Sequence, residues 1–187
     1  TIETVDGNRG KKFEQKYTNN MDEKGKAKIS STKTQPYTEI SYIADFKRFG
    51  IEEYTDDMIT LMKKRVYDCA AITDSTINVF LNDEKIEHKT FEKYIDLYLG
   101  CKTEMPRSYE RVSDRWEIGA ALSVEEKFEQ ISFVNGIATI RGGKHVDYVA
   151  NGITTAIWVK HGNDCYAPTK YGITNERRWS SWDRGFY

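Results

Sequence analysis

The sequence contains little cysteine and no long hydrophobic run. Its three cysteines, Cys69, Cys101 and Cys165, lie far apart and are odd in number, so neither a zinc ribbon nor a secreted disulfide framework is indicated. No segment approaches the roughly 20 apolar residues that span a bilayer, and residues 1–12 lack the apolar core of a signal peptide. These absences favour a reducing intracellular compartment and predict no membrane association.

The sequence also lacks an excess of charge of either sign. Its 28 Lys and Arg residues stand against 29 Asp and Glu residues, which gives a formal net charge of −1. No overall positive field exists to hold nucleic acid, so any such binding must be local. With 39% hydrophobic residues among 187, the composition is that of a globular protein that can bury a core.

Motifs that build an active site are missing as well. The sequence has no phosphate-binding glycine loop followed by Lys and Ser or Thr, no histidine pair at helical spacing and no nucleophile elbow. A Gly142-Gly143-Lys144 run before a predicted helix is compatible with an anion site. It is equally compatible with a strand that turns sharply into a helix, because glycine permits such a turn.

The apolar pattern of the first third predicts strands. Short β-prone runs at Thr1–Val5 and Phe13–Tyr17 flank a turn-rich segment and indicate a hairpin. The polar stretch 19–35 has no apolar period and is predicted to be a loop. After Pro36, the alternation over Thr38–Ala44 predicts a strand with one buried face.

Three amphipathic helices are predicted further along. The first runs from Thr55 to Ile72, and the second begins after the N-cap Thr90 and stops at Gly100. The apolar stripe of the first helix and the apolar series of the third are expected to face the core. They consist of Ile59, Met62, Val66 and Cys69 in the first helix, and of Val146, Val149, Ala150, Ile153 and Ile157 in the third.

Strands are predicted between these helices. Ile77, Val79 and Leu81 would form the buried side of one strand. In another, Trp116, Ile118, Ala120 and Leu122 alternate with Arg115, Glu117 and Gly119, which predicts a half-buried strand. A turn or bulge is expected at Asn135-Gly136. Such strands, with long loops and no regular strand–helix alternation, predict an α+β fold.

One 21-residue stretch carries a resemblance to a known family. Residues 128–148 read FEQISFVNGIATIRGGKHVDY and closely resemble the transducer signature of type IIA DNA topoisomerases, specifically the eukaryotic and viral type. Further similarity comes from DFKRFG at 45–50, KRVYD at 64–68 and RWE at 115–117, in the family's order. The likeness covers about residues 1–157.

The resemblance implies a fold and a division into domains. The fold would be α+β, with a transducer-type (ribosomal protein S5 domain 2-like) mixed sheet and helices packed on one side. Residues 1–36 would be the C-terminal strands and loop of a GHKL ATPase domain, with residues 37–157 as the transducer domain. Residues 158–187 diverge from the family and are expected to form an irregular tail.

The resemblance also implies a part of a larger enzyme. In this family the whole protein binds ATP and Mg²⁺, dimerises through the GHKL domain and passes one DNA duplex through a break in another. The present chain would be a fragment that relays ATP state to the DNA-cleaving core. No catalysis and no cofactor of its own are expected, because the family's phosphate loop and cleaving tyrosine lie outside it.

Other expectations concern nucleotide sensing and location. The family's Gln-Thr-Lys loop, whose lysine reaches the terminal phosphate, has no counterpart after residue 157. Without it, this chain is not expected to sense ATP in the family's way. The location would be the nucleus for a eukaryotic source, and the host cytoplasm or nucleus for a viral one.

Two groups of residues are candidate sites. Lys63, Lys64 and Arg65, on the surface of the first helix, could line the cavity for the transported duplex through phosphate contacts. A solvated charged surface is the alternative. The family signature is expected to form a structural strand–turn–helix corner. Its residues are Gln130, Ser132, Asn135, Gly142, Gly143 and His145.

Two other functions stay open at this point. The chain could be a stand-alone, non-enzymatic interaction module with a transducer-like fold. It could also be a relative of the bacterial-type gyrase, although its ISFVN and RVYD stretches resemble the eukaryotic and viral proteins more closely.

Overall fold

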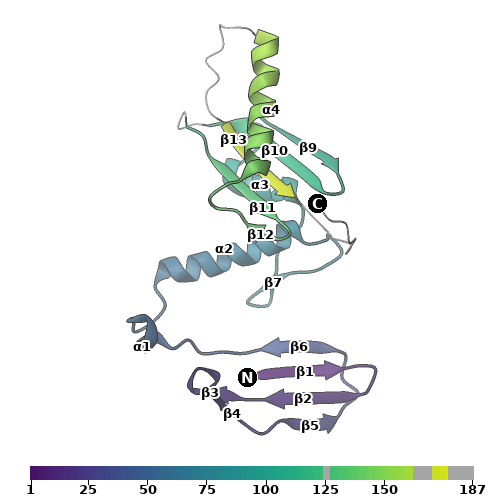
Figure 1. Ribbon diagram of the computed structural model, residues 1–187. Coiled ribbons are helices and arrows are strands. Elements are labelled where there is room, and N and C mark those ends of the chain that lie inside the picture. The colour runs from purple at the N-terminus through teal and green to yellow at the C-terminus, as the bar shows by residue number, and fades with distance from the viewer. Residues whose placement is uncertain (124–126, 162–169, 177–187) are drawn as a thin grey trace, which may run out of the picture. The chain divides into compact units, whose positions relative to one another are not determined.

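The computed structural model of the chain describes residues 1–123, 127–161 and 170–176 (Figure 1). The chain divides into two compact units, Thr1–Asp56 and Asp57–Tyr187. A domain boundary near Pro36 was predicted from the family resemblance. The structural division lies later because the strand after Pro36 pairs with the first strand of the chain, which keeps it in the first unit.

The first unit is built on a four-stranded antiparallel sheet in the order β5-β2-β1-β6. A short hairpin, β3 and β4, encloses the 3₁₀ turn η1, and the helix α1 follows the sheet. The stretch 19–35, predicted to be a loop, therefore contains strand β5, whose backbone pairing with β2 does not need an apolar period. The elements are β1 Ile2–Asp6, β2 Lys11–Gln15, β3 Tyr17–Thr18, η1 Asn19–Met21, β4 Glu23–Lys24, β5 Lys28–Ser31, β6 Tyr37–Ile40 and α1 Phe46–Phe49.

The strand register gives this sheet two unlike faces. Directly paired residues of antiparallel strands point to the same face. One face carries the apolar residues Ile2, Phe13, Ile29 and Ile40 with Thr4 and Thr38 at its centre, and Asp6, Lys11, Gln15 and Ser31 toward its ends. The other face carries the charged residues Glu3, Lys12, Glu14, Lys28 and Glu39 together with Tyr37, Ser30 and the buried Val5.

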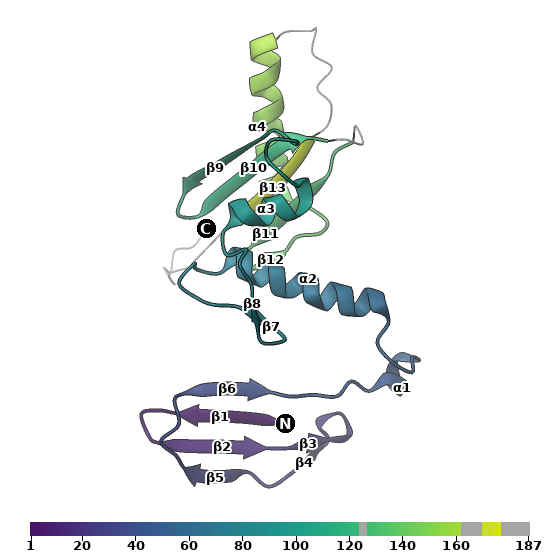
Figure 2. The same cartoon turned by 180° about the vertical axis from the view of Figure 1, so that it is seen from behind.

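The second unit contains a five-stranded mixed sheet in the order β12-β11-β13-β10-β9. Its pairs are antiparallel except for β11 with β13, which run parallel. The two-stranded β7–β8 hairpin and the helices α2, α3 and α4 complete the unit (Figures 1 and 2). The elements are α2 Asp56–Ile72, β7 Phe80–Leu81, β8 Glu84–Lys85, α3 Phe91–Leu99, β9 Arg107–Ser113, β10 Trp116–Leu122, β11 Gln130–Val134, β12 Ile137–Ala138, α4 Lys144–His161 and β13 Lys170–Glu176.

The second unit has a true hydrophobic core between α2, α3 and the sheet. Phe91, Tyr94 and Phe133 are each at most 1% exposed, and Tyr94 packs edge-on to Phe133 at a centroid distance of 5.9 Å. The helix α3 is held in place by the predicted caps, since the Thr90 hydroxyl accepts from the Lys93 N–H and Gly100 ends the helix with a positive φ. The core residues are Ala71, Phe91, Tyr94, Ile95, Leu99, Ala121 and Phe133.

Helices lie on both faces of the five-stranded sheet. Helices packed on one side of the sheet were predicted from the family resemblance. In Figure 2, α3 lies in front of the sheet and α4 behind it. The side chains agree, because Phe133 of β11 packs against α3 while the neighbouring Ser132 faces the other way, toward the hydrogen-bonded start of α4. As a result, strands in the middle of this sheet are covered on two sides.

This double coverage inverts the predicted face of β10. The alternation is present, but Glu117 and Ala121, with Gly119 between them, are the buried residues, whereas Leu122 is 58% exposed. Glu117 can be buried because the Tyr109 hydroxyl of β9 donates to its carboxylate at 3.2 Å. The prediction from hydrophobicity alone therefore assigned the wrong face of β10 to the core.

Three other predictions of buried apolar residues are also corrected. In α2, Ile59 and Met62 are 37% and 44% exposed, and the buried residues are Asp68, Ala70 and Ala71. Ile77 is 52% exposed and precedes β7. The strand predicted over Thr38–Ala44 ends at Ile40, which is itself exposed.

The last part of the chain is more regular than predicted. The helix α4 continues to His161, and Lys170–Glu176 form β13, where the sequence analysis expected an irregular tail. β13 is flanked by β10 and β11, so backbone pairing on both sides stabilises a segment whose Gly172 and Asn175 disfavour a strand. In the third predicted helix, Val146 and Val149 are buried as expected. The side chain of Ile157 lies outside the described residues.

No helix in the described ranges is both long enough and apolar enough to cross a membrane.

Candidate nucleic-acid interface and signature corner

Lys63, Lys64 and Arg65, the three cations predicted to contact DNA, lie on α2. They differ in their surroundings. The Lys64 ammonium lies 3.0 Å from both carboxylate oxygens of Asp68, one helical turn along. The Arg65 guanidinium lies 3.8 Å from Asp68 and also donates to the carbonyl of Gly136 at 2.8 Å. Lys63 is exposed and has no side-chain partner among the described residues. Lys63 is thus the member of the group whose charge is most available to a ligand.

Asp68 is the centre of a buried polar cluster that joins α2 to α3. Its side chain is 3% exposed, and it accepts from the Tyr94 hydroxyl at 2.5 Å. The Tyr94 and Tyr98 hydroxyls lie 2.9 Å apart. Such a carboxylate is tolerated in the core because cations and hydroxyls satisfy its oxygens.

The buried cluster shifts the pKa values of Tyr94 and Lys64. Burial, followed by the hydrogen bond to Asp68, raises the pKa of Tyr94 far above its ordinary value. Burial lowers the pKa of Lys64, but the hydrogen bond and the charge of Asp68 outweigh it, so the net pKa is raised. Lys64 therefore stays charged and Tyr94 stays protonated, which keeps the cluster intact at neutral pH.

The signature residues form a connected corner on the α4 side of the sheet. Gln130 donates to the carbonyls of Thr139 and Ile140 at 3.2 and 3.1 Å, and the Ser132 hydroxyl donates to Gln130 at 2.7 Å. The Ser132 and Thr139 hydroxyls are hydrogen-bonded, and the Thr139 hydroxyl lies 3.1 Å from Nε2 of His145. This chain of contacts fixes the path of the backbone from β11 to the start of α4.

The remaining signature residues make the sharp turns of this path. Asn135 and Gly136 have φ angles of 52° and 77°, the left-handed pair that a tight two-residue hairpin requires. Gly142 and Gly143 have φ angles of 72° and 153° at the entry of α4. A Cβ atom on Gly143 would lie 3.0 Å from the His145 ring. Positive φ and close packing together account for these glycines.

The corner has the features of a structural element. Its hydroxyl, amide and imidazole groups bond to one another or to backbone carbonyls. Among the described residues, no group of three or more His, Cys, Asp or Glu side chains could hold a metal ion.

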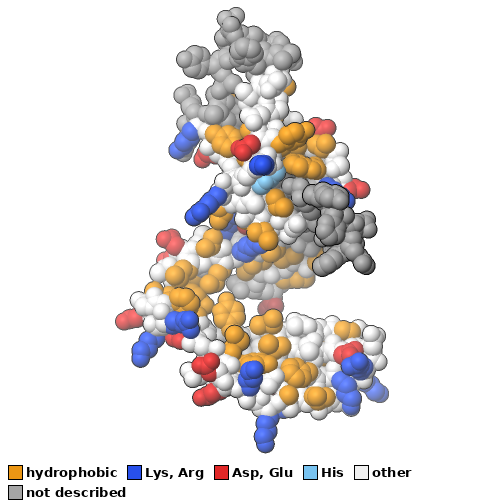
Figure 3. Space-filling model, in the orientation of Figure 1, with side chains coloured by type: hydrophobic (Ala, Val, Ile, Leu, Met, Phe, Trp, Pro, Cys, Tyr) orange, Lys and Arg blue, Asp and Glu red, His pale blue; other side chains and the backbone are white. Residues whose placement is uncertain are grey.

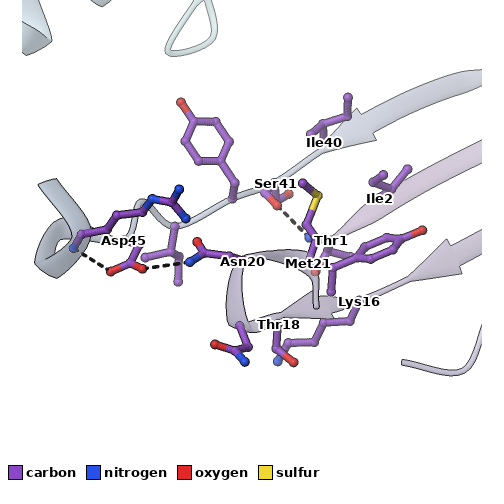
Figure 4. Close-up of a pocket in the computed structure, with 14 residues that line it drawn as sticks. Thr1, Ile2, Lys16, Thr18, Asn20, Met21, Ile40, Ser41 and Asp45 are labelled. Carbon is purple, nitrogen blue, oxygen red and sulfur yellow. Dashed lines mark hydrogen bonds between the residues drawn. The ribbon is translucent and has the colours of Figure 1, made fainter. Parts of the chain in front are cut away.

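A cavity of about 1060 Å³ lies in the first unit and was missed from the sequence. Figure 4 shows Asn20 facing Asp45, with Ile2 and Ile40 on the strands beside them. The turn that borders it has positive φ at three consecutive residues, Asn19, Asn20 and Met21. The sequence signal for this turn was weak, because asparagine tolerates positive φ but methionine does not favour it. The lining residues are Thr1, Ile2, Lys16, Tyr17, Thr18, Asn19, Asn20, Met21, Ile40, Ser41, Tyr42, Ile43, Asp45 and Arg48.

Comparisons with known proteins identify the family. The DNA gyrase B family model matches residues 51–166. A DNA topoisomerase 2 of Arabidopsis thaliana is 45% identical over 163 residues, which cover 83% of this chain and 11% of the relative. The chain thus spans about a tenth of the length of the curated relatives that it matches.

Solved structures agree with this match over nearly the whole chain. The ATPase region of Saccharomyces cerevisiae topoisomerase II superimposes with a TM-score of 0.84 at 36% identity, covering 94% of this chain and 47% of the yeast one. The ATPase and transducer domains of DNA topoisomerase II from Balamuthia mandrillaris give a TM-score of 0.80 at 31% identity, with the same coverage. The resemblance and the α+β class are confirmed, and the chain belongs to the type IIA DNA topoisomerase family.

Proposed function

We propose that this chain is the part of an ATP-dependent type II DNA topoisomerase that relays nucleotide state to the DNA-cleaving core. The observation that carries the proposal is the superposition on the yeast ATPase region, with a TM-score of 0.84 over 94% of this chain. The chain would act mechanically, within a parent enzyme that controls DNA topology by strand passage.

The proposal assigns a role to each unit. The first unit would be the end of the GHKL ATPase domain, and the second unit would contain the transducer. In support, the Balamuthia match comprises ATPase and transducer domains, and the present chain divides into two compact units. The boundary between the roles would then lie nearer Asp56 than Pro36.

A relay requires elements that move together, and the second unit has such a group. Asp68 connects α2 to α3 through Tyr94, and Arg65 connects α2 to the β11–β12 turn through Gly136. Phe133 joins β11 to α3 through its contact with Tyr94. Packed helices and strands with connected polar groups transmit displacement as a block.

ATP and Mg²⁺ would be held by the part of the ATPase region outside this chain. The described residues bring together no set of three metal-ligating side chains, and the sequence has no phosphate-binding glycine loop. The residues that the structure describes therefore do not fit the nucleotide and its metal ion. Dimerisation would likewise belong to the parent enzyme.

Duplex DNA would meet the parent enzyme partly through Lys63, Lys64 and Arg65. Lys63 is exposed, and the Lys64 and Arg65 side chains are 43% and 45% exposed despite their bonds to Asp68. The DNA-binding constant falls as the salt concentration rises. We expect Lys63→Ala to reduce the magnitude of the slope of log K against log salt by about 1, because one phosphate contact is lost. If binding to duplex DNA at low salt is unchanged when all three residues become Ala, these residues do not line the cavity.

A hybrid enzyme tests the proposed function. Residues 1–157 of this chain would replace the matching segment of yeast topoisomerase II, with the yeast sequence kept before and after. We expect ATP-dependent relaxation of supercoiled DNA by the hybrid, and no ATP hydrolysis by the present chain alone. The control is the same hybrid with Phe133→Ala, which removes a core contact of the relay. A folded hybrid without strand passage would favour the stand-alone interaction module instead.

A further inference from the structure

Four side chains of the signature corner form a hydrogen-bonded row that leads from α4 to β11. Nε2 of His145 lies 3.1 Å from the Thr139 hydroxyl, which is hydrogen-bonded to the Ser132 hydroxyl. The Ser132 hydroxyl lies 2.7 Å from Oε1 of Gln130. Ser132 is 2% exposed, so the middle of the row is closed to water. Because a hydroxyl has a single proton to donate, each bond in the row decides the direction of the next.

The Gln130 end of the row determines the first direction. The amide nitrogen of Gln130 lies 3.2 and 3.1 Å from the carbonyl oxygens of Thr139 and Ile140. Only an N–H group can donate to these carbonyls, so the amide oxygen must be the atom that faces Ser132. That oxygen has no proton, and the Ser132 hydroxyl therefore donates to it. The Thr139 carbonyl, at 3.2 Å from the same hydroxyl, can share this proton but cannot supply one.

The other two directions follow from the count of protons. Because the Ser132 proton is committed to Gln130, the bond between the Ser132 and Thr139 hydroxyls uses the Thr139 proton. Thr139 then has no proton left for His145, so their contact requires a proton on Nε2 of His145. Every bond in the row thus points away from α4. A neutral His145 has its proton on Nε2 and none on Nδ1.

The surroundings of the His145 ring are compatible with this assignment. The ring packs against Gly143, where a Cβ atom would lie 3.0 Å from Cε1 and 3.1 Å from Nδ1. Glycine at this position therefore leaves room for the ring. The ring is half-buried, and histidine, charged and hydrophobic side chains lie together at the surface around the start of α4 (Figure 3). Water can serve Nδ1, while Nε2 is directed into the protein.

The row begins where α4 meets the sheet. His145 is the second residue of α4, and the helix starts with the N–H groups of Val146 and Asp147, which donate to the carbonyl of Gly143. Val146 and Val149 are buried, at 4% and 7% exposure. Apolar packing of this kind holds the helix close to the sheet but is not directional. The hydrogen bond from His145 adds the direction.

We propose that His145 is a positioning residue that holds the start of α4 against β11 by donating the first proton of this one-way row. Its part in the relay rests on the proposed function, whereas the direction of the hydrogen bonds does not. Without the donor, the Thr139 proton can turn toward residue 145, and the Ser132 oxygen loses the bond that it accepts. The corner then has more than one arrangement of hydrogen bonds, and a displacement of α4 is passed to β11 less completely.

A matched pair of substitutions separates donation from shape. His145→Gln keeps an N–H group that can reach the position of Nε2, whereas His145→Glu has an ionised carboxylate that can only accept. A carboxylate is favourable in the first turn of a helix, so a loss in His145→Glu does not come from a weaker helix. The controls for the added charge are Asn151→Gln and Asn151→Glu, at an exposed position of the same helix.

The yeast hybrid measures the effect on the relay. The readout is the amount of DNA relaxed per ATP hydrolysed, compared with the unsubstituted hybrid. We expect His145→Gln and both Asn151 variants to stay within about twofold, and His145→Glu to fall by at least about fivefold. Equal ratios for His145→Gln and His145→Glu would overturn the positioning role.

Nitrogen NMR of the present chain tests the proton order without the hybrid. In chain labelled with 15N-histidine, the chemical shifts separate ring nitrogens with and without a proton, and His145→Gln identifies the signals of His145. At about pH 8.5, where free imidazole is neutral, we expect a proton on Nε2 and none on Nδ1. In Thr139→Val, which removes the acceptor, the signals should move toward those of free histidine. A proton on Nδ1 in the wild type, or no change in Thr139→Val, would overturn the inference.

Amide exchange of the present chain separates this inference from the proposed function. We expect the N–H groups of Val146 and Asp147 to exchange at least about fivefold faster in His145→Glu than in His145→Gln. Equal exchange in the two variants would show that donation does not hold the start of α4. An unsubstituted hybrid without DNA relaxation contradicts the proposed function, and the NMR and exchange results then decide the role of His145 by themselves.

Discussion

The two units of this chain bury their hydrophobic residues to very different degrees. The second unit places seven residues in a connected buried cluster, whereas the first unit contributes only Val5 to the buried hydrophobic residues. Both have a sheet whose neighbouring strands are paired in register. The comparison shows that backbone pairing and alternation are present in both units, but that only one has the second layer that makes a core.

The largest expected effect comes from opening the core of the second unit. Phe133→Ala should lower the free energy of unfolding of that unit by about 3–5 kcal/mol, because it leaves a cavity against Tyr94. Tryptophan fluorescence during urea unfolding is the measurement, since all four tryptophans lie in the second unit. Ile29→Ala in the first unit is the control and should change this transition by less than about 0.5 kcal/mol.

A smaller effect is expected from the polar cluster of the second unit. Asp68→Asn removes the charge that Lys64 and Tyr94 share, and should destabilise the unit by about 1–3 kcal/mol. Lys63→Ala, which removes an exposed cation of the same helix, should stay within about 0.5 kcal/mol. Equal effects of the two substitutions in the same urea experiment would contradict the view that Asp68 joins α2 to α3.

In the first unit, an apolar residue should be replaceable at little cost. Ile40→Ser in the present chain should change the free energy of unfolding of that unit by less than about 0.5 kcal/mol, because the side chain is already 68% exposed. Far-UV circular dichroism against urea follows the sheet. A loss of about 2 kcal/mol or more would mean that Ile40 is buried in solution.

The smallest effect concerns pH and the charged face. The hydrogen bond from Lys12, followed by that from Tyr37, lowers the pKa of Glu3 below the ordinary 4.5. A lowered carboxyl pKa gives stability that is present above the unfolded value and is lost as the pH falls through the folded value. The stability difference between wild type and Glu3→Gln should therefore shrink below about pH 4. In a Lys12→Ala background, this pH dependence should largely disappear.

Local signals predicted the parts of the fold that are set by local chemistry. Thr90 and Gly100 bound α3 as expected, and Asn135-Gly136 makes the predicted turn, because caps and tight turns depend on a few adjacent residues. The signature corner was predicted as a unit, although its hydrogen bonds from Gln130 to Thr139 were not. These bonds join residues that only the folded hairpin brings together.

Other features depend on contacts that one sequence does not reveal. β13 is held by neighbours on both sides, and Glu117 is buried on a face that hydrophobicity assigned to solvent. The DNA candidates Lys64 and Arg65 were predicted without their internal partner, Asp68, although the i, i+4 spacing of Lys64 and Asp68 was a visible signal. Ile40 was predicted to be buried, but it is 68% exposed.

Hydrogen–deuterium exchange of the full present chain tests the central comparison most directly. Mass spectrometry of peptides separates β1, β2, β5 and β6 of the first unit from α3, β10 and β11 of the second. We expect amides of the first-unit strands to exchange at least about a hundredfold faster than those of α3 and β11, because local opening costs less where no second layer packs. Equal protection of the two sheets would contradict the account, since the first unit would then resist local opening as well as the second unit does.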